Sequence, residues 1–177
     1  MTERILSFLD RVYLACIWVS GISILVMSLI IPWGIYARYV LGSGSSWPEP
    51  VAVLLMVTFT FFGAAATYRA GGHIAVGMLT DRMPPSLQWL CAKLVDVLMM
   101  VVCVFVMLWG YKLSMEMMRQ GLAELPWLPV GYTYMPLPIG SFLTLLFVLE
   151  NMFWGSQSQR AVVTFDHEDV PVTQGAN

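Results

Sequence analysis

The sequence predicts an all-α integral membrane protein with four transmembrane helices and both termini in the cytoplasm. Of its 177 residues, 58% are hydrophobic and only 11% are charged, whereas about 25% of the residues in a typical soluble domain are charged. A soluble protein of this composition would expose extensive apolar surface to water. The apolar residues are also gathered into four stretches, each long enough for the roughly 20 residues that a membrane helix needs.

The first two spans are expected at about residues 12–37 and 48–68. No charged residue lies between Val12 and Ala37, and this stretch is too long for the core of a secretory signal, so we expect it to remain as an anchor. Pro32 near its far end is expected to bend it. The second span follows a loop rich in Gly and Ser and can begin at Pro48 or Pro50, because proline is tolerated in a first helical turn.

The last two spans are expected at about residues 87–113 and 130–154. Pro136 and Pro138 interrupt the first half of the fourth span, which predicts a kink or an irregular turn there. We therefore assign residues 1–154 to one transmembrane domain. Residues 155–177 turn polar and acidic, and we expect them to form a disordered cytoplasmic tail.

Positively charged residues near the span ends predict the orientation, because cytoplasmic loops carry an excess of lysine and arginine. The N-terminal segment, the second loop and the C-terminal segment hold six of them: Arg4, Arg11, Arg69, Arg82, Lys93 and Arg160. The first and third loops hold three: Arg38, Lys112 and Arg119. This difference places both termini in the cytoplasm, in agreement with an even number of spans.

Several classes of function are disfavoured by composition. A net charge of -2 without a basic cluster argues against a nucleic-acid partner. The three cysteines lie in apolar stretches and form no C-x-x-C pair, which predicts buried free thiols. His73 falls in a loop and His167 in the tail, so the spans hold no histidine pair for haem. We therefore predict no catalytic, cofactor-binding or metal-binding residues, and no enzyme.

The charged residues of the four spans lie at the span ends and not at the membrane midplane. Those expected on the cytoplasmic side are Asp10, Arg11, Lys93, Asp96 and Glu150, and those expected on the periplasmic side are Arg38, Glu49, Lys112 and Glu116. Charges are costly inside a bilayer, which makes such residues candidates for function, although snorkelling and local pairing at the interface explain them as well. Lys93 with Asp96, and Lys112 with Glu116, are spaced to pair within one helix. A cation-coupled exchanger usually needs a deep carboxylate, so this distribution argues against transport by this chain alone.

Several short motifs follow one another along the chain. RYVL and SWPE stand at 38–41 and 46–49, and the later groups are GAA at 63–65, YR at 68–69, GHIAV at 72–76, LP at 125–126 and PLPIG at 136–140. In order and spacing, from Val12 to Asn151, they resemble the small membrane subunit of tripartite ATP-independent periplasmic (TRAP) transporters, also called DctQ-like. That family has R-[YF]-V-x and W-x-E-E, then a G-A-A…R-x-G-x-H-[IV]-x-V stretch and prolines in its last helix.

The resemblance implies a scaffold in a bacterial inner-membrane importer of organic acids. In this family the small subunit braces a large permease subunit, which holds the substrate and sodium sites, while a periplasmic substrate-binding protein delivers the substrate. Sodium is therefore expected at the large subunit, and no cofactor is expected here. Arg38, Glu49, Arg69 and His73 match the family pattern, whereas Pro50 and Gly77 stand where the family often has acidic residues.

These matches define the candidate structural or subunit-interface residues. Arg38 and Glu49 are expected to pair and to fix the hairpin between the first two spans, with Trp47 covering the pair at the lipid interface. The alternative is that the two charges are unpaired and point separately into water. Arg69 and His73 are expected at the cytoplasmic surface, either as a positive anchor or as a contact with the large subunit.

Two alternatives from other classes are a small homodimeric multidrug exporter and the membrane anchor of a redox enzyme. The missing deep carboxylate argues against the exporter, and the missing histidine pair argues against the anchor.

Overall fold

The structure is a computed structural model that describes residues 2–43, 46–71, 85–121 and 129–155. These residues form five helices: α1 (Thr2–Tyr39), α2 (Pro48–Arg69), α4 (Pro85–Met117), α5 (Gly131–Tyr134) and α6 (Pro136–Trp154). Within the described ranges the one β-type contact is an isolated bridge between Gly121 and Pro129.

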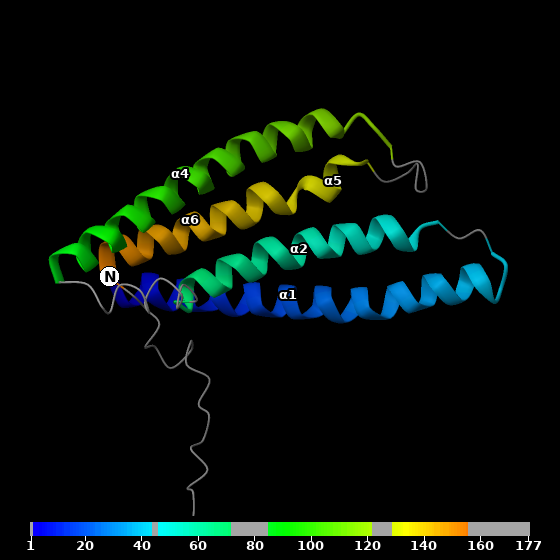
Figure 1. Cartoon of the computed structure of the whole chain (residues 1–177), viewed down its shortest axis with the longest axis horizontal. Coiled ribbons are helices and arrows are strands. Elements are labelled where there is room, and N and C mark those ends of the chain that lie inside the picture. The colour runs from blue at the N-terminus through cyan, green and yellow to red at the C-terminus, as the bar shows by residue number, and fades with distance from the viewer. Residues whose placement is uncertain (1, 44–45, 72–84, 122–128, 156–177) are drawn as a thin grey trace, which may run out of the picture.

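The four long helices lie side by side in the order α1, α2, α6, α4 (Figure 1). The main contacts join neighbours in this order, and α1 and α4 form the two edges. We call this arrangement the helix row. We call the end where α1 begins and α6 ends the proximal end. The end where α1 leads into α2, and where α5 lies, is the distal end.

Four helical segments are long and apolar enough to cross a membrane, as the sequence predicted: Glu3–Tyr39, Pro48–Arg69, Leu90–Met117 and Gly131–Trp154. The helix α1 begins ten residues before the predicted span and continues through Pro32. At 1.5 Å per residue its 38 residues extend about 57 Å, well beyond the roughly 30 Å of a bilayer core. Asp10 and Arg11 therefore belong to this helix and not to a preceding loop.

The fourth span is divided at the position predicted from its prolines. The short helix α5 ends at Tyr134, and α6 begins at Pro136 after Met135. Ser114 of α4 stabilises the short helix, because its hydroxyl donates a hydrogen bond of 2.9 Å to the carbonyl oxygen of Gly131. The expected irregular turn is thus confirmed, and a neighbouring helix satisfies one carbonyl next to it.

The hydrophobic core is concentrated at the proximal end, where α1, α2 and α6 meet. Its buried side chains are Leu9, Tyr13, Cys16, Ala65, Ala66, Tyr68, Phe147 and Val148. Cys16 and Cys103 are buried free thiols as predicted, whereas Cys91 is half-buried.

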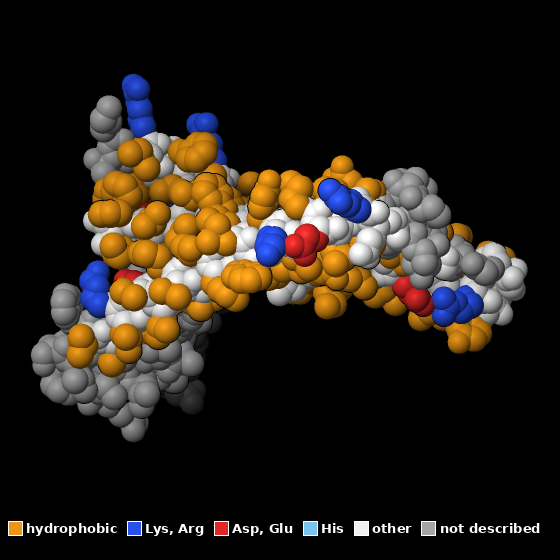
Figure 2. All heavy atoms as spheres, turned by 90° about the horizontal axis from the view of Figure 1, so that it is seen from above, with side chains coloured by type: hydrophobic (Ala, Val, Ile, Leu, Met, Phe, Trp, Pro, Cys, Tyr) orange, Lys and Arg blue, Asp and Glu red, His pale blue; other side chains and the backbone are white. Residues whose placement is uncertain are grey.

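Elsewhere apolar side chains face outward, and hydrophobic atoms cover much of the surface seen in Figure 2. Such a surface suits lipid or other membrane helices.

Candidate functional site

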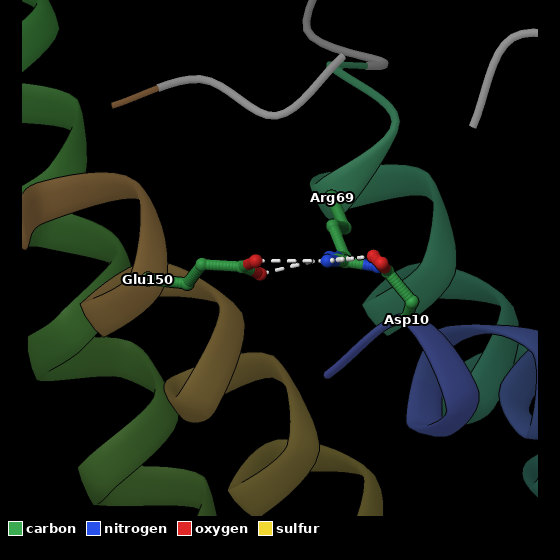
Figure 3. Close-up of polar contacts among 3 residues, drawn as sticks. All are labelled: Asp10, Arg69 and Glu150. Carbon is green, nitrogen blue, oxygen red and sulfur yellow. Dashed lines mark hydrogen bonds and ion pairs between the residues drawn. The ribbon is translucent and has the colours of Figure 1, made fainter. Parts of the chain in front are cut away.

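A buried ion cluster joins three helices at the proximal end of the row. Figure 3 shows Arg69, the last residue of α2, between Asp10 of α1 and Glu150 of α6. The Nε and Nη2 groups of Arg69 each donate a hydrogen bond of 2.8 Å to Glu150, and Nη2 also donates one of 2.7 Å to Asp10. The two-pronged geometry with Glu150 is the strong form of an arginine–carboxylate pair.

This cluster is closed off from its surroundings. The side chains of Arg69, Asp10 and Glu150 are 2%, 14% and 1% exposed. The rings of Tyr13 and Phe147 lie 5.4 Å from the guanidinium carbon, within the distance at which an aromatic face attracts a cation. Among the described residues, Nη1 of Arg69 has no hydrogen-bond partner.

A second group of polar contacts continues the cluster toward α4. Asp96 accepts hydrogen bonds from the hydroxyl of Tyr68 at 3.2 Å and from the amide of Asn151 at 2.9 Å. Lys93 lies 4.0 Å from the same carboxylate, so the predicted pairing within this helix is confirmed. Because Tyr68 adjoins Arg69 and Asn151 adjoins Glu150, the two groups form one polar layer that joins all four spans.

The chemistry of this layer is structural. Two cationic side chains, Arg69 and Lys93, face three carboxylates, those of Asp10, Asp96 and Glu150. Breaking a buried ion pair leaves an uncompensated charge and costs about 3–5 kcal/mol, so the layer holds the helices in one relative position. The part of the chain that the structure describes contains no group of three or more side chains suited to bind a metal ion.

The expectation that Arg69 lies at the surface is wrong. Its backbone ends α2, and the side chain points into the row instead of into solvent. Sequence reasoning treated Asp10 and Glu150 as separate interface charges and missed that both bind Arg69. The available signal was that both carboxylates were assigned to the same membrane face as Arg69. His73 lies outside the described residues.

A second ion pair lies at the distal end, where the sequence predicted it. Nη2 of Arg38 donates a hydrogen bond of 2.9 Å to Glu49, and the two side chains are 51% and 71% exposed. Trp47 is the N-cap residue of α2 and is 37% exposed; its covering of the pair stays a prediction. Lys112 and Glu116 of α4 also approach each other, at 4.0 Å, as their spacing predicted.

The predicted site residues therefore fall at two ends of the molecule. Arg38, Trp47 and Glu49 lie together at the distal end, whereas Arg69 lies at the proximal end. The proximal residues are buried and bind one another, while the distal residues remain accessible to a further molecule.

Comparison with known proteins gives one family match and two relatives, all of them small components of TRAP transporters. Residues 27–157, more than half of the chain, match the model of the family described as tripartite ATP-independent periplasmic transporters, DctQ component. A Haemophilus influenzae protein named as a TRAP transporter small permease protein is 28% identical over 123 residues, which cover 69% of this chain and 76% of that protein. The Vibrio cholerae sialic acid TRAP transporter small permease protein SiaQ is 23% identical over 126 residues, covering 70% of this chain and 71% of that protein.

Proposed function

The chain belongs to the DctQ family, the small permease components of TRAP transporters, and from this premise we propose that it is the scaffold of an organic-acid importer. Family membership makes it a transporter component and not an enzyme, and it decides against both the multidrug exporter and the redox anchor. The proposed role is to brace the large permease subunit and to help a periplasmic binding protein dock.

The observation that carries this proposal is the openness of the helix row. Only 11% of the most apolar stretch in each of the first three spans is buried, against 44% in the fourth. Helices of the large subunit can therefore pack on surfaces that this chain leaves uncovered. In each span the charged side chains lie toward the two ends and not at the centre, which supports a bracing role over a path for ions or substrate.

We assign the proximal end to the cytoplasm and the protein to the bacterial inner membrane. The excess of positively charged residues in the terminal segments and the second loop supports this orientation. The distal pair of Arg38 and Glu49 then faces the periplasm, where it can contact the large subunit or the binding protein. His73 would face the cytoplasm and contact a loop of the large subunit.

Sodium coupling and transport of an organic acid are assigned to the assembled transporter. The name of the Vibrio cholerae relative specifies sialic acid, a carboxylic acid, which supports this substrate class for the present chain. We assign the sodium and substrate sites to the large subunit, because the sequences of the four spans carry no carboxylate near their centres.

Reconstitution into liposomes tests the scaffold role. The small subunit alone should transport nothing, whereas the complete set of small subunit, large subunit and binding protein should take up the acid when a sodium gradient is applied. Omitting the small subunit from the complete set provides the matched control and should abolish or strongly reduce uptake. Sodium-dependent uptake by the small subunit alone would refute the proposal.

A further inference from the structure

A groove opens between the distal ends of α1 and α2. Its volume is about 460 Å³, and its apolar walls include Ile31 and Ile35 of α1 and Ala52 and Val53 of α2. The two helices come close beside it because Gly34 has no side chain: a Cβ there would lie 2.9 Å from the Cβ of Pro48. The groove is thus built from the close approach of two defined helices.

The groove is polar at one end only. Arg38 and Glu49, the ion pair described above, are among its lining residues and lie at its distal end. From Arg38 to Ile31 the helix rises about 10 Å, and the lining in that direction is apolar. Tyr39, which lines the groove beside the ion pair, is exposed, as is common where a helix passes through the headgroup layer.

This shape fits a lipid better than a transmembrane helix. A partner helix would need an apolar groove along the roughly 30 Å of the bilayer core, whereas this one extends for about two helical turns below a charged rim. A phospholipid has the matching form, with a charged headgroup at the interface and an acyl chain that runs inward.

The two rim charges select among headgroups. Arg38 attracts a phosphate through charge-assisted hydrogen bonds, but the carboxylate of Glu49 beside it repels a lipid that carries only negative charge. An aminophospholipid provides both a phosphate for Arg38 and an ammonium group for Glu49. A choline headgroup has a quaternary nitrogen without N–H groups, so it cannot donate a hydrogen bond to the carboxylate.

We infer that the groove binds one phosphatidylethanolamine molecule, with an acyl chain between α1 and α2, its phosphate on Arg38 and its ammonium group on Glu49. The inference does not depend on the proposed scaffold role, because all the residues involved belong to this chain. Bound lipid would fill the space between the two helices and hold the distal hairpin at the level of the headgroups.

The test measures lipid binding to the full-length protein in detergent by native mass spectrometry. Phosphatidylethanolamine, phosphatidylglycerol and phosphatidylcholine with identical acyl chains are titrated separately. Phosphatidylethanolamine should bind roughly two- to fivefold more tightly than the other two, a range set by the modest strength of exposed charge pairs. Equal affinity for the three lipids would overturn the inference.

Three variants assign this preference to the groove. Glu49→Gln should reduce the affinity for phosphatidylethanolamine to that for phosphatidylglycerol, and Arg38→Gln should weaken both. Ala52→Phe, which fills the groove without changing a charge, should weaken binding of all three lipids. The double variant of Lys112 and Glu116 to Gln is the matched control, because that exposed pair, at 63% and 59%, also lies toward the distal end.

A preference for phosphatidylethanolamine that is unchanged in Glu49→Gln would contradict the inference. So would a preference that is lost to the same extent in the double variant of Lys112 and Glu116. The transporter complex purified from membranes gives a second measurement. It should retain phosphatidylethanolamine with the unchanged chain and lose it with Ala52→Phe. A complex without this lipid, in which Ala52→Cys cross-links to a partner subunit, would show that a protein helix occupies the groove and would overturn the inference.

Discussion

Arg69 illustrates how a single side chain can determine the arrangement of several helices. Among the described residues it is the one basic side chain that is buried, and it bonds to carboxylates 59 and 81 positions away in the sequence. A charge in this environment is tolerated only when its partners are present. Sequence reasoning paired Arg38 with Glu49, eleven positions away, because a short loop joins them. Arg69 and its distant partners belong to separate spans, and no spacing rule connects them.

Neutralising Glu150 should destabilise the protein far more than neutralising Arg38. Glu150→Gln leaves Arg69 buried with only one carboxylate and should cost about 3–5 kcal/mol. Arg38→Gln removes a charge from an exposed pair and should cost about 0–1 kcal/mol. Thermal unfolding of both variants in the same detergent measures the difference. Equal losses would mean that the proximal cluster is not a closed structural unit.

The distal pair should show weak coupling in the isolated chain. With side chains 51% and 71% exposed, Arg38→Ala and Glu49→Ala should each lower stability slightly, and the double-mutant cycle should give a coupling energy of about 0–1 kcal/mol. The same cycle in the full transporter, read out as uptake, tests the proposed docking role. Strong non-additivity in the isolated chain would indicate that the pair is less exposed in solution than the structure describes.

At the scale of elements, the bounds of the helices were predicted mainly from the lengths of the apolar stretches and the positions of the prolines. All four spans were expected within a few residues of their observed distal ends, because charges and prolines mark those boundaries. The break between α5 and α6 was expected from Pro136 and Pro138. The helix α1 begins ten residues before the predicted span, because it continues through Asp10 and Arg11, the charges that end the apolar stretch.

Close helix packing makes Gly140 of α6 sensitive to the smallest side chain. A Cβ at this position would lie 2.5 Å from the Cβ of Phe61 and 3.1 Å from its backbone carbon, so Gly140→Ala must push α2 and α6 apart. The expected cost is about 1–3 kcal/mol. Gly21→Ala is the matched control, because nothing lies within 4 Å of its Cβ position and alanine favours the helix by up to about 1 kcal/mol.

Thermal unfolding of both glycine variants in detergent distinguishes packing from helix propensity. Gly140→Ala should lower the unfolding temperature, while Gly21→Ala should leave it unchanged or raise it. A stabilising Gly140→Ala would show that the spacing of α2 and α6 adjusts freely, and the tight crossing would then not define the helix row.

At the scale of the whole molecule, the order of the helices could not be predicted. The long helices are apolar on all sides, so no amphipathic face indicates which neighbours they contact. Residues that decide the order, such as Arg69 and Gly140, act through contacts between distant segments. The same uniform apolarity leaves much of the row uncovered by its own chain, and this uncovered surface is what the proposed large subunit would pack against.

The orientation of the row gives the last prediction. The helix α1 begins and α6 ends at the proximal end (Figure 1), and the positively charged residues of the terminal segments and second loop outnumber those of the first and third loops. Because the positively charged segments are expected to stay in the cytoplasm, the first and third loops should lie in the periplasm. Alkaline phosphatase fused after Gly44 or Gly121 should therefore be active. Green fluorescent protein should fluoresce when fused after His73 or Asn177. Each fusion point receives both reporters, so that every position has its own control for expression. An active phosphatase after Asn177 would reverse the orientation, and the pair of Arg38 and Glu49 would then face the cytoplasm, where no periplasmic binding protein could reach it.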